Sequence, residues 1–192
     1  MKITAGFDAS ERAQIARLYW SAFGPKLNAV MGPAERAVAF VEDVLDPTHA
    51  LCAHDDDGRL LGVAGFKTFD GALVGGTARH MAKHYGRLSS LWRIGLISLL
   101  ERDTENQRFL MDGIFVTEHA RGQGVGTALL DAICDEARAR GYAEVRLDVI
   151  DSNPRAHALY LREGFVAVDT HKLGLLRYIF GFESATTMIR QV

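Results

Sequence analysis

The N-terminal part of the chain carries apolar residues at helical spacing. They recur at three- and four-residue steps over residues 11–23, after a strand-like segment near 2–7, and this spacing predicts an amphipathic helix. A second helix is predicted between Gly32-Pro33 and Asp46-Pro47, because proline suits a first helical position and disfavours helix in the residue before it. This part of the chain therefore predicts a strand followed by two helices.

The middle of the chain is harder to interpret. Residues 48–54 and 59–69 are rich in strand formers and flank an acidic glycine turn, which predicts a hairpin. The next strand, 109–117, follows only after about forty residues with few strand signals. We therefore expect a helical insertion over about 70–108. Its segment 91–100 is apolar enough for a buried or interfacial helix but too short to span a bilayer.

From residue 109 onward the pattern alternates regularly between strands and helices. Gly141 and Gly164 fit the positions just after two helix ends. With no internal repeat and no low-complexity linker, we expect a single domain over residues 1–192. The elements predicted after the 109–117 strand are a glycine-rich turn, a helix over about 123–140, a strand over 144–150, a helix over 154–163, a strand after Gly164 and a last strand over 185–192.

Composition excludes several classes of function. Twenty-two Lys and Arg against 24 Asp and Glu give a formal net charge of −2, which lacks the basic excess of a nucleic-acid-binding protein. Cys52 and Cys134 are too few for a disulfide framework or a four-thiolate zinc site, so we expect reduced thiols and no metal. An export signal and a stretch of bilayer length are both missing, so we expect a cytoplasmic protein without a transmembrane segment.

A glycine-rich turn is the first candidate for chemistry. It reads Arg121-Gly-Gln-Gly-Val-Gly126 and lies between a strand and a helix. Backbone N–H groups in such a turn lack helical acceptors, and the helix dipole adds positive potential, so a diphosphate is a natural ligand. A dinucleotide fingerprint would need glycine where Thr127 stands, and a P-loop would need Gly-Lys-Ser/Thr. The alternative is a tight turn without a ligand.

The second motif runs from Asn153 to Phe165 and reads Asn-x-x-Ala-x-x-Leu-Tyr-x-x-x-Gly-Phe. Together with Arg121, Gly124 and Gly126 it resembles the GNAT (Gcn5-related N-acetyltransferase) family. The resemblance implies an α/β (α+β) fold, the GNAT acyl-CoA N-acyltransferase fold. Its sheet is mixed and mostly antiparallel, has six to seven strands flanked by helices, and here carries the helical insertion before the fourth strand.

The resemblance also implies acetyl-CoA as co-substrate. The turn backbone would hold the pyrophosphate, and the pantetheine arm would pair with main chain between the splayed strands 109–117 and 144–150. Asn153 would hydrogen-bond the cofactor, and because it precedes Pro154 it also suits a helix N-cap. The implied cofactor-binding residues are Ile114, Phe115, Val116, Arg121, Gly122, Gln123, Gly124, Val125, Gly126, Thr127, Asn153 and Tyr160.

Tyr160 is the candidate general acid. Seven residues separate it from Asn153, which places both on one helix face. A phenol in hydrogen-bond reach can protonate the departing CoA thiolate. The alternative is an aromatic side chain packed on the sheet with its hydroxyl satisfied internally.

Two aspartates are candidates for the base that removes the amine proton. Asp148 matches the position where ribosomal-protein N-terminal acetyltransferases of the family carry a base glutamate. Asp112 is the second, because strand alternation would place it on the face of Leu110 and Ile114, among mostly apolar neighbours that favour a raised pKa. For each aspartate, a solvated or capping role is equally open.

The acceptor side has no motif of its own. The family resemblance assigns it to the first two helices, here Trp20, Phe23, Lys26 and Met31, where Lys26 is interpreted as a solvated residue rather than a partner of an acceptor carboxylate. The insertion is interpreted as a solvated helix pair, with a lid or acceptor wall as the alternative. Its charged residues are basic Arg79, His80, Lys83, His84 and Arg87, then acidic Glu101, Asp103 and Glu105.

These observations predict an enzyme that transfers acetyl from acetyl-CoA to a primary amine by direct attack in a ternary complex. The rival hypothesis is a non-catalytic acyl-CoA-binding regulatory module that kept the glycine turn and lost the chemistry. A homodimer or membrane-surface contact through residues 91–100 is compatible with either. A peptide N-terminus, a lysine, a polyamine, an amino acid and an antibiotic amine all stay open as acceptors.

Overall fold

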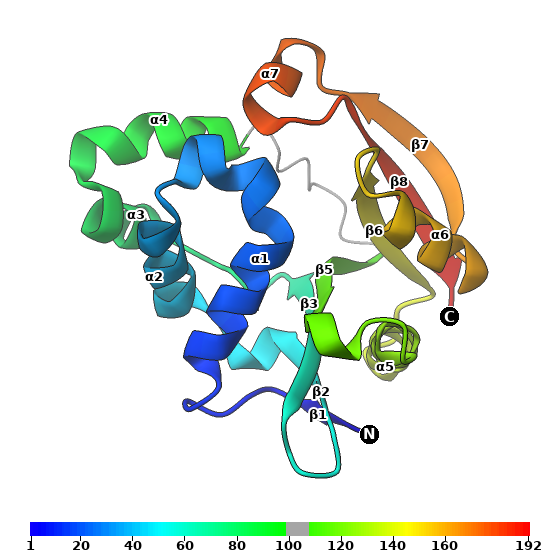
Figure 1. Cartoon of the computed structure of the whole chain (residues 1–192). Helices are drawn as coiled ribbons and strands as arrows, with labels where there is room; N and C mark the ends of the chain where they lie inside the picture. The colour runs from blue at the N-terminus through cyan, green and yellow to red at the C-terminus, as the bar shows by residue number, and fades with distance from the viewer. Residues whose placement is uncertain (99–107) are drawn as a thin grey trace.

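The computed structural model describes residues 1–98 and 108–192, and an eight-stranded sheet lies at its centre (Figure 1). The strands are β1 (Lys2–Ala5), β2 (Ala50–His54), β3 (Leu60–Thr68), β4 (Gly71–Ala72), β5 (Phe109–Val116), β6 (Glu144–Ile150), β7 (Val166–Lys172) and β8 (Ser184–Gln191). Their order is β1-β2-β3-β5-β6-β8-β7, and β4 pairs with β3 beside this path. Within the described residues β5–β6 is the one parallel pair, so the expected mixed, mostly antiparallel sheet is confirmed.

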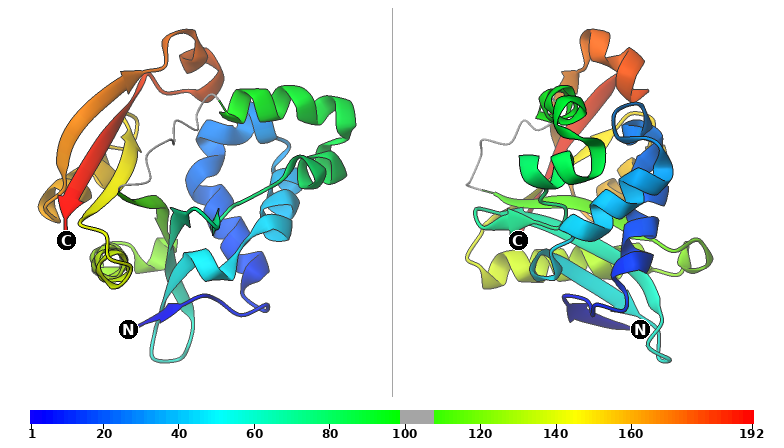
Figure 2. Two further views of the ribbon diagram at one scale, coloured as in Figure 1. Left: turned by 180° about the vertical axis from the view of Figure 1, so that it is seen from behind. Right: turned by 90° about the vertical axis from the view of Figure 1, so that its left-hand side faces the viewer.

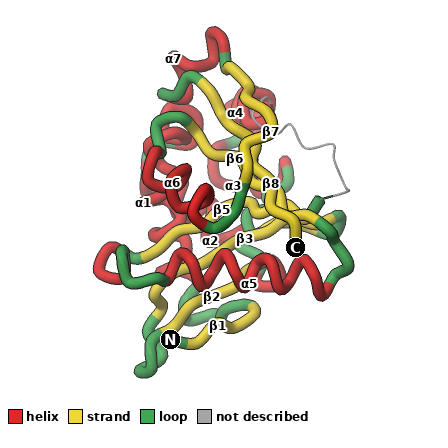
Figure 3. The backbone as a smooth tube through the Cα atoms, turned by 90° about the vertical axis from the view of Figure 1, so that its right-hand side faces the viewer, coloured by secondary structure: helices red, strands yellow, loops and turns green. Residues whose placement is uncertain are grey.

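Helices cover both faces of the sheet (Figure 2). They are α1 (Arg12–Met31), α2 (Ala34–Val44), α3 (Ala78–Tyr85), α4 (Arg87–Ser98), α5 (Val125–Ala139), α6 (Pro154–Arg162) and α7 (Arg177–Phe180), with short 3₁₀ turns at Pro47–His49, Glu118–Ala120 and Gly174–Leu176. Figure 3 shows α5 running along one face, and the buried side chains of α5 and α6 share one core there. The other helices pack in two further clusters that contain α1.

Helix α1 is longer than its sequence pattern predicts. The predicted end at Phe23 is wrong, because the helix continues through Pro25 to Met31. Proline removes only the hydrogen bond to the carbonyl of Ser21, four residues earlier. Beyond it, Val30 is fully buried in a cluster with residues of α7, and this contact stabilises the added turns.

The C-terminal strands are ordered in a way that their sequence does not indicate. Strand β8 lies between β6 and β7 and pairs antiparallel with both. The chain reverses between β7 and β8 through α7, a helix that the sequence pattern did not predict.

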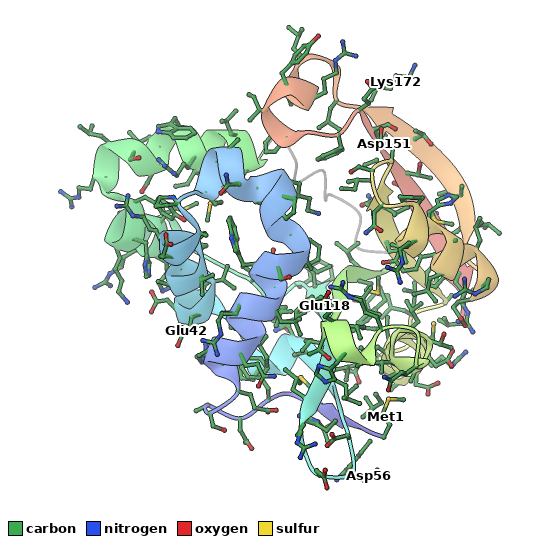
Figure 4. All side chains as sticks on the ribbon, in the orientation of Figure 1. Met1, Glu42, Asp56, Glu118, Asp151 and Lys172 are labelled. Carbon is green, nitrogen blue, oxygen red and sulfur yellow. The ribbon has the colours of Figure 1, made fainter. Side chains whose placement is uncertain are left out.

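At the opposite end of the molecule, the amino group of Met1 pairs with Asp56 at the tip of the β2–β3 hairpin, at 3.1 Å (Figure 4).

The insertion forms the helix pair α3–α4, as expected. Its basic cluster is partly neutralised from α2, because Asp43 accepts hydrogen bonds from Lys83 at 2.8 Å and from His84 at 3.0 Å. Residues 99 and 100 of the predicted apolar segment, and the acidic residues Glu101, Asp103 and Glu105, lie outside the described residues. In the described part of the chain, the helices are too short or too polar to cross a membrane.

Candidate active site

Strands β5 and β6 separate soon after they begin. Among the described residues they pair at Phe109–Val145 and Leu110–Arg146, at their N-terminal ends. Strand β5 stays bonded to β3 as far as Val116, so its other edge is open toward β6. A backbone edge without a strand partner offers N–H and C=O groups to an extended ligand.

A cleft of about 790 Å³ adjoins this open edge. Elements from both halves of the sequence meet there: α1, β5, the glycine-rich turn and α6. The lining residues are Leu18, Ser21, Ala22, Ile114, Phe115, Val116, Ala120, Arg121, Gly122, Gly124, Gly126, Thr127, Asn153, Arg155, Ala156, Ala158, Leu159, Tyr160 and Arg162. Of the predicted site residues, Gln123, Val125, Asp112 and Asp148 are not in this lining.

The glycine turn presents its backbone amides. Gly122 and Gly124 have φ of +78° and +80°, which side-chain-bearing residues rarely adopt. Within residues 1–98 and 108–192, no backbone or side-chain acceptor is present for the N–H groups of Gly122 and Gly124, nor for those of residues 125–127 in the first turn of α5. Such N–H groups at a helix N-terminus favour an anion.

Two predicted members of the turn contribute less than expected. The N–H of Gln123 donates to the carbonyl of Ala120 at 3.4 Å, and its side chain donates to the carbonyl of His119 at 2.7 Å. The side chain of Val125 is buried in the core, so only its backbone can reach a ligand. The anion site therefore consists of five N–H groups rather than the six of the run from Gly122 to Thr127.

Arginines add positive charge to the same cleft. Arg121 precedes the turn, whereas Arg155 and Arg162 stand on α6, seven positions apart and hence on one side of that helix. The sequence interpretation missed both α6 arginines, although they flank the Asn153–Tyr160 motif. Three guanidinium groups beside unpaired backbone N–H groups form a site for a polyphosphate.

Asn153 and Thr127 fix the two helices that border the cleft. Asn153 caps α6, because its Oδ1 accepts the N–H of Ala156 at 3.2 Å, and this leaves its side-chain NH₂ as a donor toward the cleft. Thr127 donates its hydroxyl to Oε1 of Glu163 at 2.9 Å and so ties α5 to the end of α6. The hydroxyl hydrogen of Thr127 is thus used within the protein, whereas its backbone N–H remains available to a ligand.

Tyr160 is held at the cleft by core packing. It is 5% exposed, its ring lies 5.9 Å from that of Phe165, and it lines the cleft. Burial raises the pKa of its phenol above the ordinary value, so the hydroxyl keeps its proton at neutral pH. In the described part of the chain this hydroxyl makes no hydrogen bond, so the alternative of an internally satisfied phenol has no support there.

The candidate base Asp148 is engaged with the sheet. It is exposed on β6, where one oxygen accepts the hydroxyl of Thr187 on β8 and the other accepts Arg146 at 3.2 Å. Both oxygens therefore have partners before any acceptor binds.

The alternation expected around Asp112 is wrong. The register of β3 against β5 shifts between Gly65 and Phe66, which inserts one extra residue in β5 at Asp112. Ile114 consequently packs with the core on the α5 face, whereas Asp112 is exposed and interacts electrostatically with Lys26 of α1. The apolar surroundings expected for this carboxylate are not found.

On α1 the cleft is lined by other residues than the sequence suggested. Leu18, Ser21 and Ala22 contribute in place of Trp20 and Met31. The ring of Trp20 covers Gly24, and Met31 is buried, with its carbonyl accepting the hydroxyl of Tyr85 at 2.6 Å. The i, i+3, i+4 spacing of Leu18, Ser21 and Ala22 was the available signal for this face.

A second hollow, of about 870 Å³, lies at the other end of the molecule. Its lining includes the carboxylates of Asp8, Glu11, Asp55 and Asp56. Negative charge of this density repels a polyphosphate. The cleft beside β5 is therefore the candidate active site.

Comparisons with known proteins identify the family of this chain. A family model described as "Acetyltransferase (GNAT) family" matches residues 12–165. A mycothiol acetyltransferase of Beutenbergia cavernae is 48% identical over 52 residues, which cover 27% of this chain and 18% of that protein. One from Jonesia denitrificans is 43% identical over 56 residues, 29% of this chain and 18% of that protein. These relatives are thus matched over a small part of their length.

Solved structures share the fold along the whole chain. An N-acetyltransferase from Staphylococcus aureus Mu50 has a TM-score of 0.67 at 14% identity and covers 99% of this chain and 100% of its own. A GCN5-related N-acetyltransferase from Kribbella flavida has a TM-score of 0.61 at 17% identity, with 100% and 97% covered. At such identities the likeness shows the fold alone.

Proposed function

Because this chain belongs to the acetyltransferase (GNAT) family, we propose that it transfers the acetyl group of acetyl-CoA to a primary amine. One observation carries the proposal: the open edge of β5 leads directly to the unpaired N–H groups of the glycine turn. An extended arm ending in a diphosphate matches both features. A streptothricin acetyltransferase described as putative, from Bacillus anthracis, which shares the fold at a TM-score of 0.51, was solved in complex with acetyl-CoA.

Binding of acetyl-CoA follows from the chemistry of the cleft. The backbone of Ile114 to Val116 pairs with the amides of the arm, and the N–H groups around Gly124 hold the pyrophosphate with Arg121, Arg155 and Arg162. Asn153, which caps the N-terminus of α6, donates a hydrogen bond from its side-chain NH₂ to the cofactor. This arrangement directs the thioester into the gap between β5 and β6.

The reaction proceeds by direct attack in a ternary complex. The amine nitrogen bonds to the thioester carbon, the C–S bond breaks, and the CoA thiolate takes the proton of the Tyr160 hydroxyl. The nitrogen then loses one proton as the amide forms, and this proton returns through solvent to the Tyr160 oxygen. A covalent acyl-enzyme on cysteine is disfavoured, since Cys52 and Cys134 are buried. Burial raises the pKa of the Cys52 thiol to about 12, which keeps it protonated and unreactive.

Deprotonation of the amine falls to the carboxylates of the β5–β6 gap. Asp112 lies in the β5 bulge beside the start of the gap, and Asp148 stands across it on β6. Asp148 would act with both oxygens already accepting hydrogen bonds, and Asp112 with its charge interacting with Lys26, so each of the two is proposed as a candidate base. The amine is thereby neutral when it meets the thioester.

Two measurements test the proposed function together. Calorimetric titration with acetyl-CoA should show one binding site per chain, and a thiol-release screen over amine classes should show turnover with at least one of them. Binding without turnover on any amine would support the regulatory-module hypothesis. Absence of binding would overturn the proposal altogether.

A further inference from the structure

We propose that Lys26 binds a carboxylate of the acceptor, so that the acceptor class is an amine that also carries a carboxylate. This inference deepens the proposed function and rests on it. It assigns specificity to a residue of α1 that the reaction itself does not use.

Lys26 stands on α1 four residues after Ala22 and is not itself part of the cleft lining. Leu18 and Ala22 line the cleft, and Lys26 follows Ala22 by four residues, so the three side chains form one row along the helix. The row continues from the cofactor cleft toward the start of the β5–β6 gap. Lys26 is thus placed one helical turn beyond the cofactor-lining residues.

Packing against β5 fixes the position of this ammonium group. Its Nζ lies 4.5 Å from the centroid of the Phe23 ring. That ring rests on Gly113, where a Cβ atom would come within 2.6 Å of Cζ of Phe23. Lys26 is therefore held above β5 next to Asp112, whose charge interacts with it. This is the point where β5 leaves β6.

Among the described residues, the ammonium group of Lys26 makes no hydrogen bond to a carboxylate. Lys26 is half-buried rather than solvated, and burial lowers its pKa below the ordinary lysine value. In the described part of the chain it makes no hydrogen bond and no salt bridge, and its contacts are the Phe23 ring and the more distant charge of Asp112. Lys83, by contrast, reaches Asp43 at 2.8 Å.

A carboxylate on the acceptor would complete this arrangement. It would supply the charged hydrogen-bond acceptor that the half-buried ammonium lacks. Asp112, whose opposite charge interacts with Lys26, would then face the amine end of the same molecule. Two opposite charges side by side at the gap suit an acceptor with opposite charges at its two ends.

The test compares acceptors that differ only in the carboxylate. Thiol release is measured for a series of aminocarboxylic acids and for the matching carboxamides, with the wild type and with Lys26→Met. We expect the wild type to prefer the acids by at least about tenfold in kcat/KM. Lys26→Met should bring this ratio to about one without changing the KM for acetyl-CoA, and Lys26→Arg should retain part of the preference.

The matched control is Lys2→Met on β1, an exposed lysine that lines the second hollow and not the cleft, which should keep the wild-type ratio. A second readout does not depend on turnover: calorimetric binding of each acid and its carboxamide to the protein loaded with CoA. The inference fails, and the proposed function stands, if the wild type acetylates acids and carboxamides equally. The same holds if Lys26→Met keeps the wild-type ratio of kcat/KM values. Acetylation of Lys26 itself, seen by intact mass, would also overturn the inference. Failure of every amine to be acetylated would overturn the proposed function as well.

Discussion

The two sides of the β5–β6 gap are built from different parts of the polypeptide. On the cofactor side, backbone N–H groups around Gly124 face the cleft, and any residue with the right φ and ψ would provide them. On the acceptor side, side chains such as Lys26 and Asp112 supply the polar groups. A site made of backbone groups can be recognised in the sequence by its glycines. A site made of side chains shows only common residue types at helical spacing.

The two sides also differ in charge. The cofactor side gathers arginines beside unpaired N–H groups and is uniformly positive, which suits one kind of ligand, a polyphosphate. The acceptor side sets the ammonium of Lys26 beside the carboxylate of Asp112. In our proposal, the first arrangement binds the cofactor and the second selects among acceptors.

The largest expected effect concerns the residue that joins the two sides. Tyr160→Phe removes the proton donor and keeps the packing on Phe165, so kcat should fall at least about 100-fold, whereas the Kd for acetyl-CoA should stay within about twofold. Because burial raises the pKa of Tyr160, ionisation of this phenol should not limit wild-type activity near neutral pH. Steady-state kinetics and a pH profile measure both.

Tyr142→Phe is the control for this change, since Tyr142 packs on Phe109 outside the cleft. Its kcat should equal that of the wild type. An unchanged kcat in Tyr160→Phe would show that the cleft does not use this phenol.

The next largest effect tests the backbone N–H groups of the glycine turn. Gly124 and Gly58 have φ of +80° and +79°, and a Cβ on either would meet no atom within 4 Å. Valine should strain both positions similarly, but only Gly124→Val should disturb the N–H groups that face the cleft. We expect its Kd for acetyl-CoA to rise about 10- to 100-fold by calorimetry, with Gly58→Val near the wild type. Equal affinities in the two variants would contradict the assigned pyrophosphate site.

A smaller effect separates the two aspartates of the acceptor side. Of Asp112→Asn and Asp148→Asn, the variant that removes the base should lower kcat about tenfold, because asparagine keeps the shape of the side chain but does not accept the amine proton. The other variant should keep kcat near the wild-type value, although Asp148→Asn also alters the contacts with Thr187 and Arg146. Both variants should bind acetyl-CoA as the wild type does. An unchanged kcat in both variants would show that neither carboxylate removes the amine proton.

The smallest effect concerns the bridge between α2 and α3, in which Asp43 accepts hydrogen bonds from Lys83 and His84. Hydrogen bonds from Lys83 and His84 lower the pKa of Asp43 from 3.8 to about 2. A carboxylate whose pKa is lower in the folded than in the unfolded protein stabilises the fold at pH values above its unfolded-state pKa. That contribution is lost as the pH falls toward the folded-state pKa. Asp43→Asn should therefore lower the Tm slightly at neutral pH, and the difference should shrink between pH 3.8 and 2.

Asp135→Asn provides the comparison for Asp43, because its partner Arg138 lies on the same helix. Its effect on Tm should be smaller still, since it links no second element. A Tm difference for Asp43→Asn that is constant over this pH range would show that the α2–α3 bridge does not contribute to stability.

Local elements were predictable where the pattern repeats within one segment. The alternation of β6 and the capping residues Asn153 and Gly164 lie in short stretches whose conformation depends on near neighbours. The bulge at Asp112 was not predictable, because it arises from the register against β3, far away in sequence. The extension of α1 past Pro25 was missed for the same reason, since α7 buries its last turns.

By itself the sequence determined the family, the glycine turn with its backbone N–H groups, and the helix that carries Asn153 and Tyr160, because each depends on residues close together in the chain. Only the tertiary structure decided which α1 side chains line the cleft, that Asp148 is bonded to β8, and that Lys26 is half-buried beside Asp112. These features depend on how distant segments pack, and packing selects among side chains that look alike in sequence.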